Sequence, residues 1–552
     1  MENELSPTSE RDVEPSPGKV GEDLRDIHPG ASIDIATLLK QAMSFHQAGR
    51  LAEAEAVYQQ ILKTSPCNFD ALHLLGVMHY QRGNHANAIR YIDLALDTNP
   101  KTAAAHSNRG NALLALKRLD EALASYDRAI ALRPDYAEAF SNRGNALLAL
   151  KRLDEALASC DRSIALRSDC AEAFSNRGTV LQALKRLDGA LASYDRAIAL
   201  RPDYAEAFSN RGTVLQALKR LDEALASYDR AIALKPDYAD GFKNRALCRF
   251  LAGQYTEGWI DYEWRWNTAD FPKRPNFANW QGETVEGRHL LIFSEQGLGD
   301  IIQFARYLPL LAPYRCRLTF LTSAKLVRLL RPLTSGIEVI SALGSEQNFD
   351  FQCALMSLPH RLGTDISTIP NLVPYLRADD DLIASWSKRI GEHGFKIGIT
   401  WQGNPLSPVD KGRSISLNEY VELARIPSVR LISLQKGYGS DQVTKLPKDV
   451  TIETLGDAFD SGPDAFIDTA AVISTLDLVI TADTAIAHLA GALGCRTWIA
   501  LKYVPHWPWM LDRDDSPWYP TVRLFRQMRP DNWAPVFATI ANELRLLCRR
   551  FG

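Results

Sequence analysis

The sequence lacks long apolar runs, paired cysteines and any large excess of charge. No stretch of its 552 residues reaches the roughly 18 consecutive apolar residues that a membrane-spanning helix needs, and the N-terminus shows no basic patch followed by an apolar run. The eight cysteines form no CxxC pair and no Cys/His cluster with the spacing of zinc ligands. We therefore expect a cytoplasmic protein without a transmembrane segment, a disulfide framework or a bound metal.

The charges nearly cancel, since 63 lysines and arginines face 66 aspartates and glutamates. A protein that binds nucleic acid or anionic lipid usually carries an excess of basic residues or a basic stripe, so we expect neither as a partner.

The length predicts several domains. Residues 1–32 are polar, interrupted by proline and poor in large apolar side chains. We predict that this tail is disordered, because ordering it would bury too little surface to offset the lost conformational entropy.

Residues 35–268 repeat with a period of 34 residues. Five asparagines mark this period: Asn108, Asn142, Asn176, Asn210 and Asn244. Within a unit, apolar residues recur at spacings of three and four in two runs, which predicts a helix–turn–helix. About seven such units would stack into an all-α solenoid, because one unit alone cannot bury its apolar face.

The most regular units hold Gly at the eighth place, Ala at the twentieth and Pro at the thirty-second, as at Gly144, Ala156 and Pro134. In these positions they resemble tetratricopeptide (TPR) repeats. The resemblance implies a superhelix that binds a protein or peptide in a groove lined by the first helix of each unit. The five asparagines fall on that helix, where their amides suit an extended polypeptide. The alternative is that duplication of near-identical units repeats every residue, functional or not.

The seventh unit departs from the pattern in an aromatic run: Trp259, Tyr262, Trp264 and Trp266. A terminal repeat has to cover an apolar face that no further repeat buries. We therefore predict that this run joins the solenoid to the region that follows a connector at 271–287.

From residue 288 on, short apolar segments alternate with helical patterns, which predicts parallel sheets with crossover helices. We expect an α/β region made of two Rossmann-like halves, 288–380 and 394–552. An amphipathic helix at about 533–548 is expected to dock across both halves. Strands are predicted at 289–293, 317–323, 336–342, 395–403, 429–435, 477–483 and 496–501, and helices at 465–475 and 484–493.

A glycine turn between a predicted strand and helix contains Gly297, Gly299 and Asp300. Glycine lets a ligand approach the backbone, and a helix N-terminus favours an anion. A dinucleotide-binding fingerprint would need another glycine three residues after Gly299, where Ile302 stands, so the match to an NAD site is incomplete. Asp300 is either the cap of this helix or a catalytic carboxylate.

A second strand–helix junction holds Asp483, Thr484 and His488. Asp483 or Thr484 is expected to cap the helix, and N–H groups in its first turn could bind a diphosphate at the carboxyl edge of the sheet. His488 lies one helical turn beyond Thr484 on the same face. It is either a ligand contact or a hydrogen-bonded helix residue.

Together the two junctions resemble the family 9 glycosyltransferases, the heptosyltransferase-like enzymes of the GT-B fold. The first matches the N-terminal glycine loop of the family, which implies that Gly297 and Gly299 contact the donor and that Asp300 is the catalytic base. The second matches the family's D-T-x-x-x-H motif, which contacts the diphosphate and the donor sugar.

The segment 399–405 is similar to the family's loop after the first strand of the C-terminal half. The resemblance implies that Gln402 and Asn404 contact the donor. A basic residue, Lys411 or Arg413, is implied to face the donor's phosphates.

The family resemblance implies an inverting glycosyltransferase that moves a sugar from a nucleotide-diphosphate donor to an acceptor hydroxyl without a metal ion or other cofactor. The TPR superhelix would bind a protein partner or the acceptor, an arrangement similar to the protein O-GlcNAc transferases. The alternative is a TPR interaction scaffold whose glycosyltransferase-like domain is inactive. A nicotinamide-dependent enzyme is a third reading.

An aromatic cluster lies near the C-terminus: Trp507, Trp509, Trp518 and Tyr519. Such rings stack on a sugar or nucleobase, or they pack connectors between domains. We favour packing.

Overall fold

Two compact units make up the chain, and each is described by itself. In a computed structural model they comprise Met1–Ser168 and Asp169–Gly552. The residues described are 34–269, 271–333, 335–407 and 410–551, so the predicted tail at 1–32 lies outside them. Among these residues, no helix combines the length and the apolar character needed to cross a membrane.

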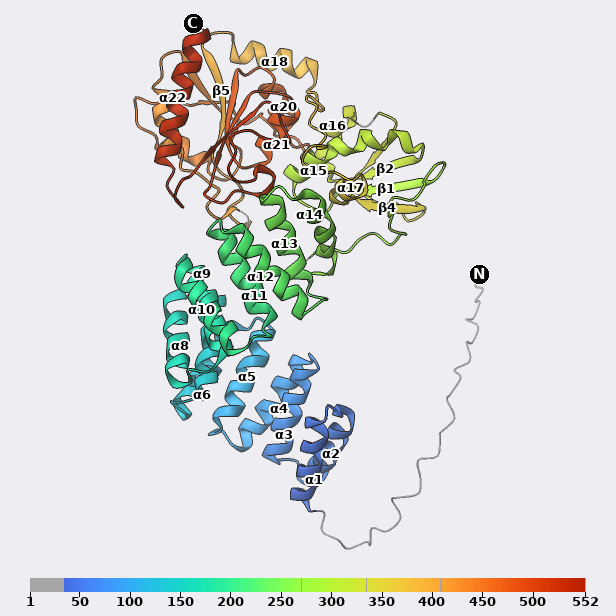
Figure 1. Ribbon diagram of the computed structural model, residues 1–552, viewed down its shortest axis with the longest axis vertical. Coiled ribbons are helices and arrows are strands. Elements are labelled where there is room, and N and C mark those ends of the chain that lie inside the picture. Colours follow the sequence, from blue (N-terminus) through green and yellow to red (C-terminus); the bar gives the residue numbers. More distant parts are fainter. Residues whose placement is uncertain (1–33, 270, 334, 408–409, 552) are drawn as a thin grey trace, which may run out of the picture. The chain divides into compact units, whose positions relative to one another are not determined.

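The first unit consists of helix pairs whose two members are joined by short turns (Figure 1). A residue with positive φ in each turn lets the chain reverse after the first helix. Gly49 and Gly83 supply it in two pairs, and Lys117 and Lys151 adopt φ of 60° in the next two. The helices are α1 (Ile35–Gln47), α2 (Leu51–Thr64), α3 (Phe69–Gln81), α4 (His85–Thr98), α5 (Ala103–Ala115), α6 (Leu119–Leu132), α7 (Ala137–Ala149) and α8 (Leu153–Leu166).

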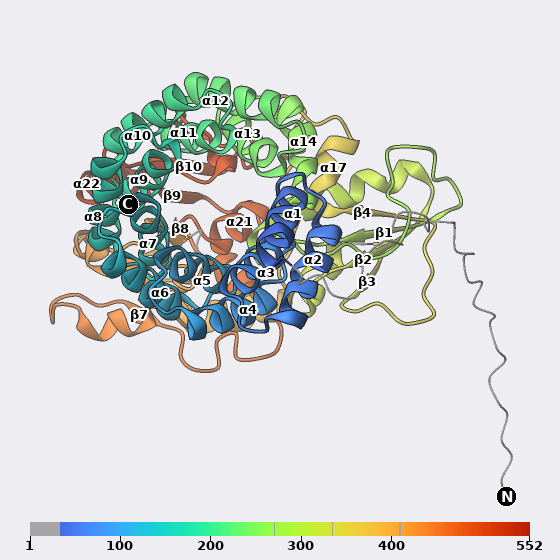
Figure 2. The ribbon, with the colours of Figure 1, turned by 90° about the horizontal axis from the view of Figure 1, so that it is seen from below.

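The same pairs continue in the second unit, which confirms the predicted all-α repeat array. Figure 2 shows α11 and α13 on the inner side of an arc, with α12 on its outer side. The elements are α9 (Ala171–Ala183), α10 (Leu187–Leu200), α11 (Ala205–Ala217), α12 (Leu221–Leu234), α13 (Ala239–Leu251), α14 (Tyr255–Tyr262) and the 3-10 segment η1 (Glu263–Asn267).

The eighth place of a repeat has to be small. A Cβ added to Gly212 in α11 would lie 2.7 Å from the ring of Tyr228, which is buried in α12. We expect Gly212→Ala to lower the free energy of unfolding by about 1–3 kcal/mol, the usual cost of overpacking a core. Chemical denaturation of the full chain measures this change.

Gly189→Ala in α10 is the matched control, because its Cβ would lie 3.4 Å from Leu181, an ordinary contact. Replacing a helix-interior glycine there is expected to stabilise the protein by about 0.5–1 kcal/mol. Equal effects of the Gly212 and Gly189 variants would contradict the packing argument.

Turns of the repeats in the second unit contact loops of its α/β part. Lys185 forms an ion pair with Asp531. The Lys219 Nζ lies 4.1 Å from the centroid of the Tyr503 ring, in cation–π geometry. These repeats are therefore docked onto the α/β part.

The α/β part contains two sheets, and every strand pairs in parallel. Their orders are β3-β2-β1-β4 and β10-β9-β8-β5-β6-β7. The order reverses between β1 and β4 in the first sheet and between β5 and β8 in the second, where Thr400 pairs with Thr481. Open α/β sheets bind ligands at such switch points. The strands are β1 (His289–Phe293), β2 (Arg317–Leu321), β3 (Glu338–Ile340), β4 (Phe351–Ala354), β5 (Phe395–Thr400), β6 (Val429–Ser433), β7 (Glu453–Thr454), β8 (Leu478–Ala482), β9 (Thr497–Leu501) and β10 (Val522–Arg526).

Helices cover the sheets on both sides. With the first sheet are α15 (Leu298–Phe304), η2 (Ala305–Tyr314), η3 (Ala324–Leu326), α16 (Val327–Leu330), η4 (Arg331–Leu333), η5 (Leu355–Ser357) and α17 (Leu358–Arg361). With the second are α18 (Asp380–Ile390), η7 (Leu417–Tyr420), α19 (Val421–Ala424), η8 (Ser440–Lys445), α20 (Ile467–Ile473), α21 (Ala485–Ala492), η9 (Trp507–Trp509) and α22 (Ala534–Phe551).

The final helix packs on one sheet only. Val536, Phe537, Ile540 and Leu544 of α22 share a core with β5, β8 and β9. Figure 1 shows α22 on one face of this sheet and α20 and α21 on the other. The expectation that this helix docks across both halves is wrong, because its apolar residues pack into the core of the second sheet.

Candidate functional site

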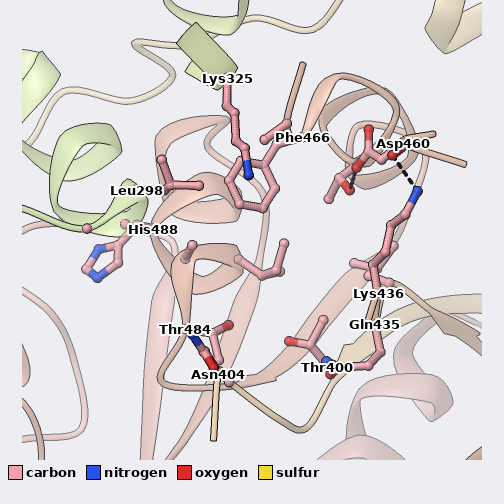
Figure 3. Close-up of a pocket in the computed structure, with 18 of the residues that line it drawn as sticks. Leu298, Lys325, Thr400, Asn404, Gln435, Lys436, Asp460, Phe466, Thr484 and His488 are labelled. Atoms are coloured by element: carbon pink, nitrogen blue, oxygen red, sulfur yellow. Dashed lines mark hydrogen bonds between the residues drawn. The ribbon is translucent and has the colours of Figure 1, made fainter. Parts of the chain in front are cut away.

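One pocket of about 730 Å³ lies at the switch point of the second sheet, between β5 and β8, and is also lined by loops of the first sheet. Its lining comes from loops that follow the carboxyl ends of strands in both sheets. Gly297 and Asp300 follow β1. Lys325 follows β2, and Thr484 follows β8 (Figure 3). A volume of this size falls in the range of small-molecule sites, about 300–1,000 Å³.

Asp483 brings a buried carboxylate to the wall of the pocket. Its Oδ1 accepts a hydrogen bond of 2.9 Å from Trp509 Nε1. Its Oδ2 is buried and finds no hydrogen-bond partner among the described residues. Burial raises the pKa of the Asp483 carboxyl, but the charges of His506 and Arg413 outweigh it, so the pKa lies below its usual range. The carboxylate is therefore ionised at neutral pH.

Helix α21 presents its N-terminus to the pocket through Thr484, Ala485 and Ile486. Thr484 is the N-cap residue, with an extended backbone (φ −134°), but its side chain makes no capping hydrogen bond within the described structure. The expected side-chain cap is thus absent there. The N–H groups of the first turn and the helix dipole favour an anion at this place.

His488 is a core residue whose edge reaches the pocket. It is 4% exposed, its Nδ1 lies 3.1 Å from Tyr519 Oη, and its ring stacks on Trp509 with centroids 5.1 Å apart. Burial lowers the pKa of His488 to about 3, so the imidazole is neutral at physiological pH. Of the two readings of His488, the geometry favours the hydrogen-bonded helix residue.

Gly299 allows two helices to touch. A Cβ there would lie 3.2 Å from His488 Cδ2 and 3.3 Å from Ala485 Cα. Both contacts are tighter than ordinary packing, so a larger residue at 299 would require α15 and α21 to shift apart by a few tenths of an ångström. Gly299 also borders the pocket, as does the exposed Gly297, the N-cap residue of α15.

Asp300 is not the N-cap residue of α15, which is Gly297, but it supports the start of that helix from its first turn. It lies in the first turn of α15 and lines the pocket. Burial raises the pKa of the Asp300 carboxyl, opposed by His506 and by a hydrogen bond from the Gly297 backbone. A carboxylate that reaches back to the N-cap N–H stabilises the helix start. Asp300 therefore supports the helix N-terminus and also faces the pocket.

Of the two basic candidates, Arg413 lines the pocket and Lys411 does not. The Arg413 Nε is buried without a hydrogen-bond partner among the described residues, and it lies 4.0 Å from Asp410 Oδ1. Lys411 is exposed, and its backbone oxygen accepts a bond of 3.2 Å from Lys502 Nζ. The choice left open by the sequence therefore falls on Arg413.

Gln402 and Asn404 lie in the loop after β5, and the unpredicted Gln435 holds that loop. The Gln435 Oε1 accepts from the Gln402 N–H at 3.1 Å, and its Nε2 donates to the Gln402 oxygen at 2.9 Å. Asn404 is exposed at the edge of the pocket (Figure 3).

His506 and Lys436 line the pocket and were missed from the sequence. Burial lowers the pKa of His506, while Asp483 and Asp300 raise it. Lys436 Nζ donates to backbone oxygens of the loop after β7, one of them in Asp460 (Figure 3). His506 begins the segment His-Trp-Pro-Trp, and its position directly before the aromatic cluster is the signal that could have identified it.

Phe466 closes one side of the pocket in a strained conformation. Its φ is 65°, in the left-handed region that bulky side chains rarely adopt. Strain of this kind tends to cluster at ligand sites.

The repeat asparagines are half-buried on the first helices: Asn108, Asn142, Asn176, Asn210 and Asn244. Bonds within the solenoid are made by Asn108, whose Nδ2 lies 3.0 Å from His73 Nε2, and by Asn142, whose Nδ2 donates to Asn111 Oδ1 at 3.0 Å. Such bonds give these amides a structural role besides any contact with a peptide.

The aromatic cluster packs domains together, as favoured from the sequence. The rings of Trp507, Trp509, Trp518 and Tyr519 are buried. Trp507 lies 4.6 Å from the Phe250 ring of α13, and Trp518 Nε1 donates to Tyr255 Oη at 3.2 Å. These contacts join the last repeat to the second sheet.

Comparisons with known proteins concern the repeats above all. Models described as TPR or tetratricopeptide repeat match residues 39–103, 110–151, 137–170 and 169–237. Protein FlbA of Caulobacter vibrioides is 26% identical over 319 residues, 53% of each chain. Cellulose synthase operon protein C of Komagataeibacter xylinus is 39% identical over 77 residues, 14% of this chain and 6% of that protein.

The chain thus spans about half the length of FlbA and a small part of the second relative. A solved tetratricopeptide repeat protein from Parabacteroides merdae is 18% identical, with a TM-score of 0.37, and the match covers 42% of this chain and 91% of that one. Taken with the 34-residue helix pairs, the matching models show that residues 39–237 are tetratricopeptide repeats.

Proposed function

We propose that the α/β part is an inverting glycosyltransferase of the GT-B type, which moves a sugar from a nucleotide-diphosphate donor to an acceptor hydroxyl. One observation carries the proposal. Asp300, Arg413 and the N-terminus of α21 border a single pocket, which lies at the switch point of the second sheet and is lined by loops of both sheets. A base and two groups suited to a diphosphate are the parts that this transfer needs.

In the proposed reaction, the Asp300 carboxylate takes the proton of the acceptor hydroxyl while that oxygen forms a bond to the anomeric carbon. The bond between this carbon and the diphosphate oxygen breaks, and the nucleoside diphosphate leaves with the electron pair. Arg413 and the first-turn N–H groups of α21 stabilise the negative charge that grows on the departing diphosphate. The proposed reaction uses no metal ion for this. The raised pKa of Asp300 makes it a stronger base.

The repeats are proposed to bind a protein partner or the acceptor itself. Stacked helix pairs form extended surfaces suited to a polypeptide. The asparagines of the first helices, named above, remain the predicted contacts, because an amide can both donate to and accept from one peptide unit.

The test is release of nucleoside diphosphate by the purified full chain, with a panel of nucleotide sugars as donors. Arg413→Ala is expected to lower kcat/KM by about 10²–10³-fold, because it removes a charge that stabilises the leaving group. The control is Arg425→Ala, an exposed arginine of the same half that pairs with Glu422 and Asp449. It is expected to keep the wild-type rate, since surface ion pairs contribute little.

A wild-type protein that turns over no donor in the panel would contradict the proposal and favour the TPR scaffold with an inactive domain. If NAD(P) raised the thermal stability of the protein and nucleotide sugars did not, the nicotinamide-dependent alternative would be favoured.

A further inference from the structure

The last repeat contacts the loop that leads into α15. Gln296 lies between β1 and Gly297, and its Nε2 donates to Tyr262 Oη at the end of α14. Tyr262 is buried, and its ring packs against Trp259 and Phe250 of the same repeat. The loop next to the pocket is therefore bonded to a side chain of the solenoid.

A second contact lies one turn further along the chain, at Arg265 in η1. Its guanidinium is fully buried and donates from Nη2 to Glu295 Oε1 at 3.0 Å and to Ser357 Oγ at 2.7 Å. Its Nη1 donates to Glu263 Oε1 at 2.8 Å. Arg265 thus links the repeat end to the loops after β1 and β4, which flank the switch point of the first sheet.

Tyr262 differs from its equivalent in the preceding repeat in its hydrogen-bond partner, and Arg265 differs from its equivalents in residue type. Tyr262 stands at the same place in its unit as Tyr228, whose hydroxyl oxygen lies 3.3 Å from both Thr213 Oγ1 and Gln216 Oε1, inside the solenoid. The place of Arg265 is small in the preceding units: Ala129, Ser163, Ala197 and Ala231. The arginine is therefore not required by the repeat, and its partners lie in the α/β part.

The charges explain why an arginine is buried here. Glu295 is 2% exposed at the side chain and Glu263 is 23% exposed, and both bond to Arg265. A guanidinium can serve several acceptors at fixed angles, so one side chain fixes the direction of Glu295. Glu295 and Gln296 stand directly before Gly297, the N-cap residue of the helix that carries Asp300.

We propose that Tyr262 and Arg265 of the last repeat are positioning residues of the active site, which hold the loop 295–299 so that Asp300 faces the pocket. This inference rests on the proposed function for its catalytic meaning. The holding of the loop itself is a property of the fold and is tested separately. The repeat array is then a structural part of the enzyme besides a surface for partners.

The experiment compares Tyr262→Phe with Tyr228→Phe in the full chain. Each variant loses one buried hydroxyl at the same place of a repeat, but only the first loses a bond to the loop. Hydrogen–deuterium exchange of peptides covering 294–304 is expected to be about tenfold faster in Tyr262→Phe, because a lost tether lowers the free energy of local opening. Exchange of this segment is expected to be unchanged in Tyr228→Phe.

The second measurement is the turnover of donor by the same variants. Tyr262→Phe is expected to lower kcat about tenfold while the KM for the donor stays the same, since a misplaced base affects the chemical step and not donor binding. Tyr228→Phe is expected to retain the wild-type kcat and KM.

A second variant avoids reliance on a single hydroxyl. Arg265→Met combined with Glu295→Gln removes the tether without leaving a charged Glu295 beside an apolar side chain, and it is expected to accelerate exchange in the same segment. Wild-type exchange at 294–304 in both Tyr262→Phe and this double variant would overturn the positioning proposal. Faster exchange in a protein whose wild type turns over no donor would support the loop contact and refute the glycosyltransferase.

Discussion

Replacing Asp300 with asparagine is expected to lower the turnover of donor by about 10²–10⁴-fold, the usual contribution of a general base. The amide has the size of the carboxyl and can still accept the hydrogen bond from Gly297, so the start of α15 is expected to stay intact. The donor's KM should change little. Asp381→Asn is the matched control, because Asp381 is exposed in the first turn of α18 and lies outside the pocket.

The pH profile gives an independent check of the same residue. Burial raises the pKa of Asp300, and the base is its ionised form. Turnover by the wild type is therefore expected to fall as the pH decreases through this raised pKa, at a higher pH than an exposed aspartate would give. Wild-type kcat in Asp300→Asn would show that another group accepts the proton.

Replacing Arg265 with methionine is expected to lower the free energy of unfolding of the second unit by about 3–5 kcal/mol. The methionine fills part of the volume but leaves Glu263 and Glu295 without the guanidinium that both contact. Removing one partner from a buried ion pair costs more than the pair contributes, because an uncompensated charge remains. Denaturation followed by tryptophan fluorescence measures the loss.

The protonation of Glu295 supplies the control for this variant. Burial raises the pKa of Glu295 from 4.5 to about 7, so the folded state binds its proton more tightly than the unfolded state. Its contribution to stability is full below about pH 4.5 and is lost as the pH rises to about 7. Glu295→Gln is expected to flatten this dependence and to recover part of the loss in Arg265→Met. The exposed Glu286→Gln is expected to do neither, and an equal rescue by it would refute the pairing.

The repeats were predictable because every unit carries its own signals. The spacing of apolar residues and the turn at Lys117 or Lys151 recur in each unit, so helix ends such as Leu119 and Leu132 follow from local sequence. Strand β1 and the helix after it were equally clear, since five mostly apolar residues precede a glycine turn.

Three strands escaped prediction for different reasons. Strand β7 has only two residues, Glu453–Thr454, and β4, Phe351–Ala354, is short and follows a polar stretch. In β10, Arg523 and Arg526 interrupt the apolar pattern, and Arg523 bonds to Glu543 of α22. Such strands are set by the neighbours they pair with and not by their own composition.

The candidate site was predictable from local pattern where a strand runs directly into a helix, and the family resemblance added Gln402, Asn404 and Arg413 in loops that line the pocket. Asp300 and Asp483 stand at such junctions, and their roles remain predictions. His506 and Gln435 lie in irregular loops, and what brings them to the pocket is the tertiary fold. The choice of Arg413 over Lys411 likewise needed the loop conformation, because the two are separated by a single residue.

The close crossing of α15 and α21 at Gly299 limits how the two halves of the α/β part can move. Gly299 contributes no side chain to this crossing, where Ala485 and His488 of α21 lie against its backbone, so we expect any closure of the two halves over a ligand to pivot near it. Lys325 and Asp460, which line the pocket from other loops, would then travel inward while Asp300 and Thr484 keep their spacing. The reacting groups would be preorganised before a donor arrives, and closure would serve to exclude water.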